Sequence, residues 1–203
     1  MNDDADYLAR LAQEWNLEFS DETCGLLLAF VGRLMAWNAR INLTGAKSAR
    51  DLIGEHLVDS FAMTRFLSIG CSVVDVGAGG GLPGIPLAVL RPDIQLTMVE
   101  PRAKRVAFLR TASHELGLRQ ARILRCRCDE LQGQSFDVCA SRATFPPDEW
   151  IGMGLALARD GGLVLVFASQ PWQPENPGMR LVNSVLYTSG SGRTRWIGAF
   201  CST

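Results

Sequence analysis

The sequence predicts an α/β fold of the doubly wound type, with a mainly parallel sheet, antiparallel strands at its C-terminal edge and a helical extension at the N-terminus. Two observations predict it. Apolar residues such as Leu27, Phe30 and Leu34 recur at helical spacing in the first third of the chain. Short β-branched runs then alternate with helical segments, as in parallel strands joined by crossover helices. We expect residues 1–66 to form the extension, packed on the core, and residues 67–203 to form the main domain.

Most elements have a local start or stop signal. The acidic residues at Asp21 and Glu22 favour a helix start, and residues 48–51 have the capping-box pattern that opens a second helix through His56 toward Phe66. Further helices are expected from near Pro83 or Pro86, over residues 102–116 with Gly117 as a left-handed stop, and from Pro147 to Gly161–Gly162. The expected strands are residues 73–76, 94–99, 123–128, 136–141, 163–167, 181–187 and 195–200, with a proline-rich loop over residues 171–178.

The charge distribution is more informative than the net charge of −1. A net charge this small does not indicate a general attraction to nucleic acid. Residues 101–127 contain eight bases and one acid. Such a stretch can attract phosphates locally, but a solvated helix face has the same composition. The 47% hydrophobic content is ordinary for a soluble globular protein.

Metal sites, leaders and membrane spans are not expected. The six cysteines and two histidines form no zinc-ligand spacing, so we expect reduced thiols and no metal. Cys126 and Cys128 would share one face of a strand. The acidic start lacks the features of a signal peptide, and no apolar run approaches the ~20 residues of a membrane span. We expect a cytoplasmic monomer that does not bind membranes.

Residues 75–84 carry the strongest chemical signal, because they place four glycines within five positions of a strand-to-helix turn. Ligands of such sheets bind beyond the carboxyl ends of the strands, and glycine lets them approach the backbone. The pattern also matches the G-x-G-x-x-G fingerprint of dinucleotide-binding proteins. A pyrophosphate, however, would be repelled by Asp75, and Pro83 and Pro86 lack N–H groups for an anion. S-adenosylmethionine, with two cationic groups and no phosphate, fits better.

Two further carboxylates follow expected strands. Glu100 could accept hydrogen bonds from both ribose hydroxyls of the cofactor, or serve only as an acid at a helix N-terminus. Asp129 could accept from an adenine amino group, or form a solvated loop pair with Glu130.

Residues 74–87 are similar to the signature of the glucose-inhibited division protein B family, which methylates N7 of a guanine in bacterial 16S ribosomal RNA on a class I methyltransferase fold. The proline-containing extension Leu-Pro-Gly-Ile-Pro makes this signature more specific than a glycine loop alone. The resemblance runs in order through residues 37–38, 42–44, 56–60, 104–110, 114–118 and 141–143. It implies S-adenosylmethionine as cofactor and the small ribosomal subunit or its RNA as partner.

The resemblance also implies roles for individual residues. It implies cofactor contacts from Gly77, Leu82 and Arg142, and contacts to adenine from Cys128 and Asp129, while Asp75, Gly79 and Glu100 fill the usual class I positions. Arg142 could meet the cofactor carboxylate or the target base, or form a structural ion pair. The chain departs from the family after the fifth expected strand, where residues 166–170 lack the usual Lys-Gly pair, and at its proline-rich residues 144–147.

The chemistry requires alignment more than acid–base catalysis. N7 of guanine has a lone pair and no proton, so no general base is needed, and we assign no catalytic residue except a possible role of Arg142. His56 and Asp59, on one helical face, could shape the substrate mouth or form a buried pair. Candidates for phosphate contacts are Lys47, Arg50, Arg102, Lys104 and Arg105. The alternatives are a methyltransferase for small molecules or proteins, a nicotinamide-dependent oxidoreductase, and an inactive cofactor-binding module.

Overall fold

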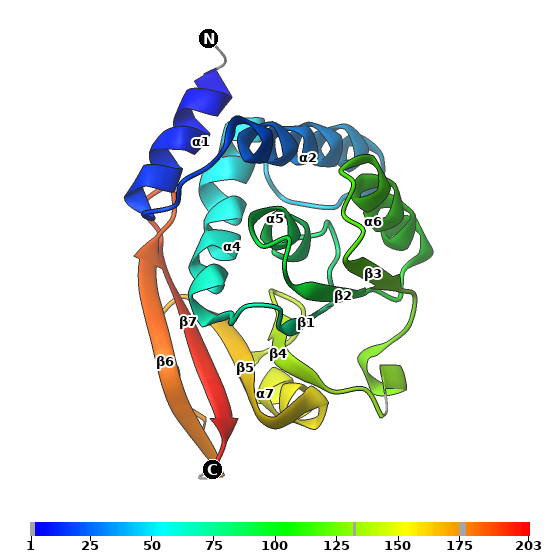
Figure 1. The fold of residues 1–203 in the computed structure, drawn as a ribbon, viewed down its shortest axis with the longest axis vertical. Coiled ribbons are helices and arrows are strands. Elements are labelled where there is room, and N and C mark those ends of the chain that lie inside the picture. The colour runs from blue at the N-terminus through cyan, green and yellow to red at the C-terminus, as the bar shows by residue number, and fades with distance from the viewer. Residues whose placement is uncertain (1–2, 132, 175–177) are drawn as a thin grey trace.

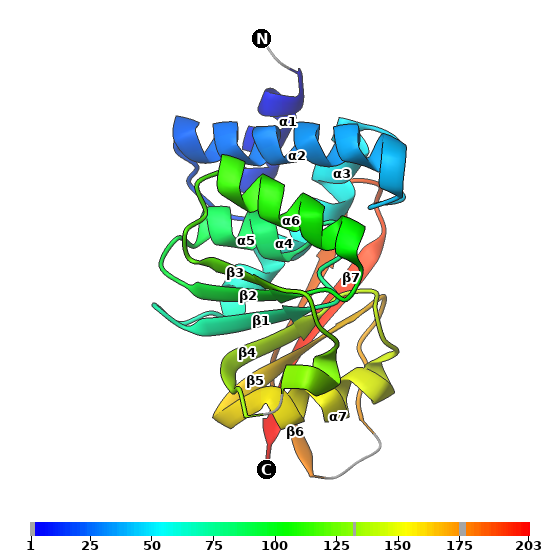
Figure 2. The same ribbon diagram turned by 90° about the vertical axis from the view of Figure 1, so that its right-hand side faces the viewer.

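The computed structural model describes residues 3–131, 133–174 and 178–203, so residues 175–177 of the expected proline-rich loop lie outside the described residues. A seven-stranded sheet runs through the molecule in the order β3-β2-β1-β4-β5-β7-β6 (Figures 1 and 2). Its strands are β1 Ser72–Val76, β2 Gln95–Val99, β3 Ala121–Leu124, β4 Phe136–Ser141, β5 Ala158–Ala168, β6 Met179–Thr188 and β7 Thr194–Ser202.

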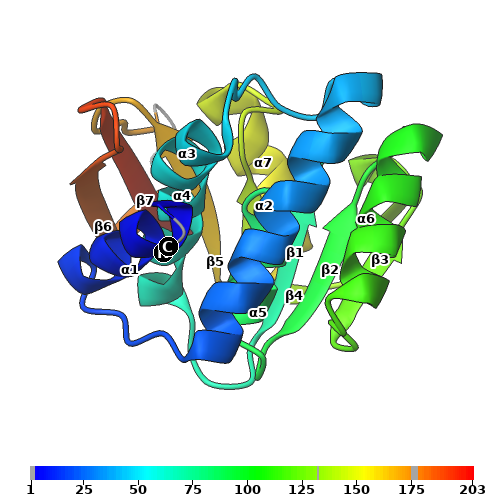
Figure 3. The same ribbon diagram turned by 90° about the horizontal axis from the view of Figure 1, so that it is seen from above.

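The first five strands pair in parallel, and β7 is antiparallel to both β5 and β6. The helices are α1 Asp3–Glu14, α2 Asp21–Ile41, α3 Ala49–Leu52, α4 Val58–Met63, α5 Gly84–Leu90, α6 Ala103–Glu115 and α7 Pro147–Leu157. Helices cover both faces of the sheet, with α5 and α6 on one face and α7 on the other, while α2 lies over α5 and α6 (Figures 2 and 3). The doubly wound architecture with an antiparallel C-terminal edge is therefore confirmed.

Alternation along β1 separates two hydrophobic clusters. Val73 belongs to the cluster on the α5 side, whereas Val74 and Val76 belong to the cluster on the α7 side. Because side chains alternate between the faces of a strand, Asp75 points to the same side as Val73, toward α5. This orientation decides where the carboxylate of the glycine loop lies.

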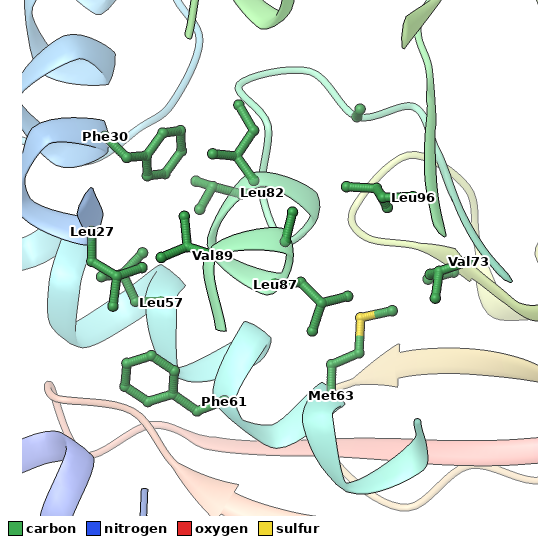
Figure 4. Close-up of a cluster of buried hydrophobic side chains, with 14 of the residues drawn as sticks. Leu27, Phe30, Leu57, Phe61, Met63, Val73, Leu82, Leu87, Val89 and Leu96 are labelled. Atoms are coloured by element: carbon green, nitrogen blue, oxygen red, sulfur yellow. The ribbon is translucent and has the colours of Figure 1, made fainter. Parts of the chain in front are cut away.

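The N-terminal helices contribute to the main core. Leu27 and Phe30 of α2 and Phe61 of α4 pack in one cluster with Leu87 and Val89 of α5 (Figure 4). Burying each of these side chains contributes roughly 1.5–3 kcal/mol. The division at residue 66 remains a prediction, since the helices on either side of it share this cluster.

The expected second helix is interrupted. A π-helical segment, Ile53–Leu57, separates α3 from α4, and a short 3₁₀ turn, Thr64–Phe66, ends the run. Gly54 O, in this segment, accepts a hydrogen bond from Gly190 N, 2.9 Å away in the β6–β7 hairpin. Such π segments are rare and often occur at functional sites.

Two elements end earlier than expected. The strand expected over residues 123–128 ends at Leu124, and a 3₁₀ turn, Cys128–Leu131, follows. Cys126 and Cys128 therefore do not share a strand face. The helix expected to end at Gly161–Gly162 ends at Leu157, because the chain enters β5 before these glycines.

One helix of the described part of the chain is long and apolar enough to cross a membrane by length and composition, contrary to the expectation that no run approaches this length. It is α2, near the N-terminus. Core helices of globular proteins share this length and composition, and α2 buries Leu27, Phe30, Val31 and Leu34 in the core.

Candidate functional site

The glycine loop lies between the end of β1 and the start of α5. Gly77 N and Ala78 N both donate to Val99 O at the end of β2, at 2.8 and 3.1 Å, which ties the loop to the carboxyl ends of the central strands. Gly77, Gly79 and Gly81 have φ angles of +77°, +53° and +77°, which side chains rarely adopt. The glycines are therefore required by the backbone path itself.

A cavity of about 290 Å³ opens over this loop. One wall is the loop from Gly77 to Leu82, with Arg105 beside it. Residues 43–45 come from the loop after α2, His56 comes from the π-helical segment, and residues 142–144 follow β4. Its size lies near the lower end of the range for small-molecule sites. The structure thus brings Gly77, Gly79, Leu82, Arg105 and Arg142, all expected site residues, to a single cavity.

Glu100 is placed at the edge of this loop. Its carboxylate accepts hydrogen bonds from Gly79 N at 3.1 Å and Arg102 N at 2.9 Å, and its Oε2 lies 3.6 Å from Arg105 Nη1. These bonds hold the carboxylate at the end of β2, and only 2% of the residue is exposed. Oε1 has one donor and keeps acceptor capacity for a further hydroxyl.

Asp75 lies beneath the loop rather than in the cavity. Its Oδ2 accepts a hydrogen bond from Gly84 N at 3.2 Å, and its Oδ1 is buried without a partner among the described residues. Burial raises the pKa of Asp75 to about 7, partly offset by the Gly84 hydrogen bond and by the charge of Arg142. An electrostatic role of Asp75 toward a ligand would therefore act through the loop.

Arg142 belongs to a buried polar network. Its Nε forms an ion pair with Asp59, which also receives both a hydrogen bond from Tyr187 Oη at 2.7 Å and two from Arg195 Nη1 at 2.9 and 3.0 Å. Asp59 is 1% exposed. Glu55 balances the second cation, with its Oε2 3.0 Å from Arg195 Nη2. Arg142 thus forms a structural ion pair, one of the three roles that the sequence left open, and it also lines the cavity.

His56 is held neutral by the same network. Arg142 Nη2 lies 2.6 Å from His56 Nδ1, and a guanidinium has only donors, so Nδ1 accepts and carries no proton. The proton is then on Nε2, which can donate to Thr44 Oγ1 at 3.4 Å. Burial, followed by the charge of Arg142, lowers the pKa of His56 to about 4. His56 is thus fixed by Arg142.

Cys128 and Asp129 are not among the residues that line the cavity. Both lie in the 3₁₀ turn after β3, where the Asp129 carboxylate is 68% exposed and 3.4 Å from Arg127 Nε. Their expected contact with adenine remains a prediction.

The candidate phosphate-binding residues have different surroundings. Lys47, Arg102 and Lys104 are exposed. Arg50 instead forms an ion pair with Asp3 at 3.2 Å and lies over the ring of Tyr7. Arg105 lines the cavity and pairs with Glu100 at the edge of the loop. The sequence thus identifies the cationic residues but does not predict which residues they pair with.

Sequence reasoning missed Glu55, Tyr187 and Arg195, which complete the network around Asp59. Their partners lie 128 to 140 positions away along the chain, so no local pattern marks them. The family resemblance covered residues up to 143 and did not reach the two from the C-terminal strands.

The donors and acceptors of the cavity fit S-adenosylmethionine. A Cβ at Gly77 would clash with Thr144 of the cavity wall, so the cavity requires glycine there. Glu100 offers an acceptor, and the unpartnered Oδ1 of Asp75 adds potential negative charge under the loop. By contrast, the carboxylates near the loop disfavour a pyrophosphate.

Comparisons with known proteins agree with this geometry. Residues 23–176 match the family model GidB, rRNA small subunit methyltransferase G. The chain is 37% identical over 145 residues to ribosomal RNA small subunit methyltransferase G of Neisseria gonorrhoeae (strain NCCP11945), covering 71% of this chain and 70% of the relative. It is 38% identical over 162 residues to the protein of the same name from Anaeromyxobacter dehalogenans (strain 2CP-C), covering 78% and 75%.

A solved structure supports the fold. The O-methyltransferase from Bacillus cereus, in complex with S-adenosylhomocysteine, superposes with a TM-score of 0.64 at 15% identity and covers 97% of this chain and 96% of its own. The sheet is thus that of the class I S-adenosylmethionine-dependent methyltransferases. With the family model matching more than half of its length, the chain belongs to the rRNA small subunit methyltransferase G family of rRNA methyltransferases.

Proposed function

We propose that the protein transfers a methyl group from S-adenosylmethionine to N7 of a guanine in 16S ribosomal RNA of the small ribosomal subunit. One observation carries the proposal: every residue that lines the 290 Å³ cavity lies within residues 23–176, the part of the chain that matches the family. The relatives that support it are themselves named ribosomal RNA small subunit methyltransferases.

The chain's own residues would bind and orient the reactants. Gly77, Gly79 and Leu82 would form the backbone cradle, and Glu100 would accept from the ribose hydroxyls. When bound, the cofactor supplies an electrophilic methyl group on a cationic sulfur. Asp75 would favour that charge from below the loop, and Arg142 would border the reaction site. The remaining proposed cofactor contacts are Cys128 and Asp129.

No proton transfer is required of the protein. N7 of guanine has a lone pair and no proton to remove, so the task of the protein is to hold the guanine in line with the methyl group and exclude water. His56, neutral and bonded to Arg142, adds no competing charge to the cavity wall. The proposed contacts to RNA phosphates come from Lys47, Arg50, Arg102, Lys104 and Arg105. The protein is proposed to act as a monomer in the cytoplasm, without a metal.

We expect the affinity for S-adenosylmethionine to rise with pH up to about 7. The pKa of Asp75 in the folded protein is about 7 instead of 3.8. Without ligand, the Asp75 carboxyl is therefore protonated at pH values between 3.8 and about 7. A cationic ligand favours the ionised form, so binding releases a proton, and affinity should change by up to about tenfold per pH unit below pH 7. Calorimetry in buffers of different ionisation enthalpy measures this release.

The matched variant is Asp75→Asn, which keeps an acceptor for Gly84 N but cannot ionise. Its affinity should be weaker and should lose most of the pH dependence. Wild-type and variant curves of equal slope would show that Asp75 does not sense the ligand charge.

The function is tested by incubating the purified protein with labelled S-adenosylmethionine and small subunits from cells that lack this modification. We expect incorporation into one guanine of 16S RNA, mapped as N7-methylguanine. Transfer only to small molecules or proteins would favour the alternative substrates, and binding of NADH in place of S-adenosylmethionine would overturn the cofactor assignment.

A further inference from the structure

A second cavity lies at the free edge of the sheet. It measures about 410 Å³ and is formed by the C-terminal half of α6, the turn after it and β3. Its lining includes Arg110, Ser113, His114, Arg119 and Ile123. We call it the α6–β3 groove; α6 and β3 lie side by side at the end of the sheet opposite β6 (Figures 1 and 3).

This groove is separate from the glycine-loop cavity. Arg105 lines the glycine-loop cavity, and the nearest groove residue on the same helix is Arg110, five residues further on. At 1.5 Å per residue this corresponds to about 7.5 Å along the axis, and the residues that line the two cavities do not overlap. A ligand in the groove would therefore not touch the reacting atoms.

The two arginines that line the groove have no counter-charge among the described residues. Arg110 and Arg119 form no ion pair or side-chain hydrogen bond there, and both are exposed. The neighbouring acid Glu115 is already paired with Arg33. Unpaired guanidinium groups gathered at one edge raise the local positive potential and attract phosphates.

One further feature favours RNA over another protein, and a second indicates a ligand that accepts hydrogen bonds. Among the described strands, the edge strand β3 pairs with β2 alone, and arginines along an exposed edge disfavour the addition of a strand from another protein. Ser113, 4% exposed, lines the groove, and its Oγ has no hydrogen-bond partner among the described residues. A buried hydroxyl without a partner is costly, and an acceptor such as a phosphate oxygen would satisfy it.

We propose that the α6–β3 groove binds the phosphate backbone of the substrate RNA, through Arg110 and Arg119, at a segment other than the one that carries the target guanine. The proposal rests on the proposed function and identifies a second contact with the same partner. Because this contact is made equally in the ground and transition states, its loss should raise KM and leave kcat unchanged.

The test uses Arg110→Ala/Arg119→Ala in the full-length protein, with Arg10→Ala/Arg65→Ala as the control that removes the same charge. The control residues are exposed and lie over Tyr7 and Trp15, in the N-terminal helices. Binding to protein-free 16S RNA and to undermethylated small subunits is measured as a function of salt. We expect the groove variant to bind both more weakly, with a salt slope smaller by about 2, one unit for each lost phosphate contact.

Cofactor affinity by calorimetry and kcat should match those of the wild type. RNA affinity equal to that of the control would overturn the proposal, and so would weaker binding to the subunit alone, which would indicate an acidic ribosomal protein. Failure of the wild type to methylate any guanine would instead overturn the proposed function, since the binding measurement does not depend on transfer.

Discussion

Replacing Gly77 by alanine is expected to weaken S-adenosylmethionine binding by about 100-fold, or roughly 2.7 kcal/mol. A Cβ at this position would lie 2.3, 2.5 and 2.8 Å from Oγ1, Cγ2 and Cβ of Thr144. These atoms are close to the Thr144 backbone, so the segment after β4 must move, and this segment forms one wall of the cavity. Isothermal titration calorimetry measures the affinity directly.

Gly70→Ala provides the matched control. Gly70 has a φ of +70°, nearly that of Gly77, but a Cβ there would meet no atom within 4 Å. Both variants carry the strain of a left-handed alanine, about 1–2 kcal/mol, so both should unfold at a lower temperature. Only Gly77→Ala should lose cofactor, and Thr144→Gly in the same chain should restore part of the affinity. Equal binding by the two single variants would contradict the steric explanation.

The elements predicted from sequence are those whose signals are local. Gly117, in the left-handed conformation at +68°, follows α6 as expected, and Pro147 begins α7. The glycine loop was located for the same reason, because the residues that force its path are consecutive. Helix and strand types therefore followed from neighbours in the chain.

The site could be predicted only in part, because its polar network is assembled from distant segments. The π segment of Ile53–Leu57 depends on the hairpin that contacts Gly54, and that hairpin lies 136 residues downstream. Strand alternation indicates that Asp75 faces α5 rather than the cavity, whereas its place at the strand end alone indicates the ligand side. Asp59 was marked by its motif, whereas its partners from the C-terminal strands were not.

Asp59→Asn is expected to lower the free energy of unfolding by about 3–5 kcal/mol, the cost of breaking a buried ion pair from one side. Asp59 is 1% exposed and is the shared partner of Arg142 and Arg195. Without its charge, Glu55 still faces Arg195, but Arg142 keeps only neutral His56. Denaturant titration at pH 7 measures the change.

Asp3→Asn is the control, because the Asp3–Arg50 pair is exposed, with 92% and 47% of the two side chains accessible, and exposed pairs contribute about 0–1 kcal/mol.

The network also predicts an effect of Asp59→Asn on ligand binding. Arg142 lines the cavity and is held by Asp59, so its release should weaken cofactor or RNA binding even where the variant remains folded. A variant as stable as Asp3→Asn would show that water reaches Arg142 and replaces the carboxylate, and the network would then be a solvated cluster rather than a support for the cavity wall.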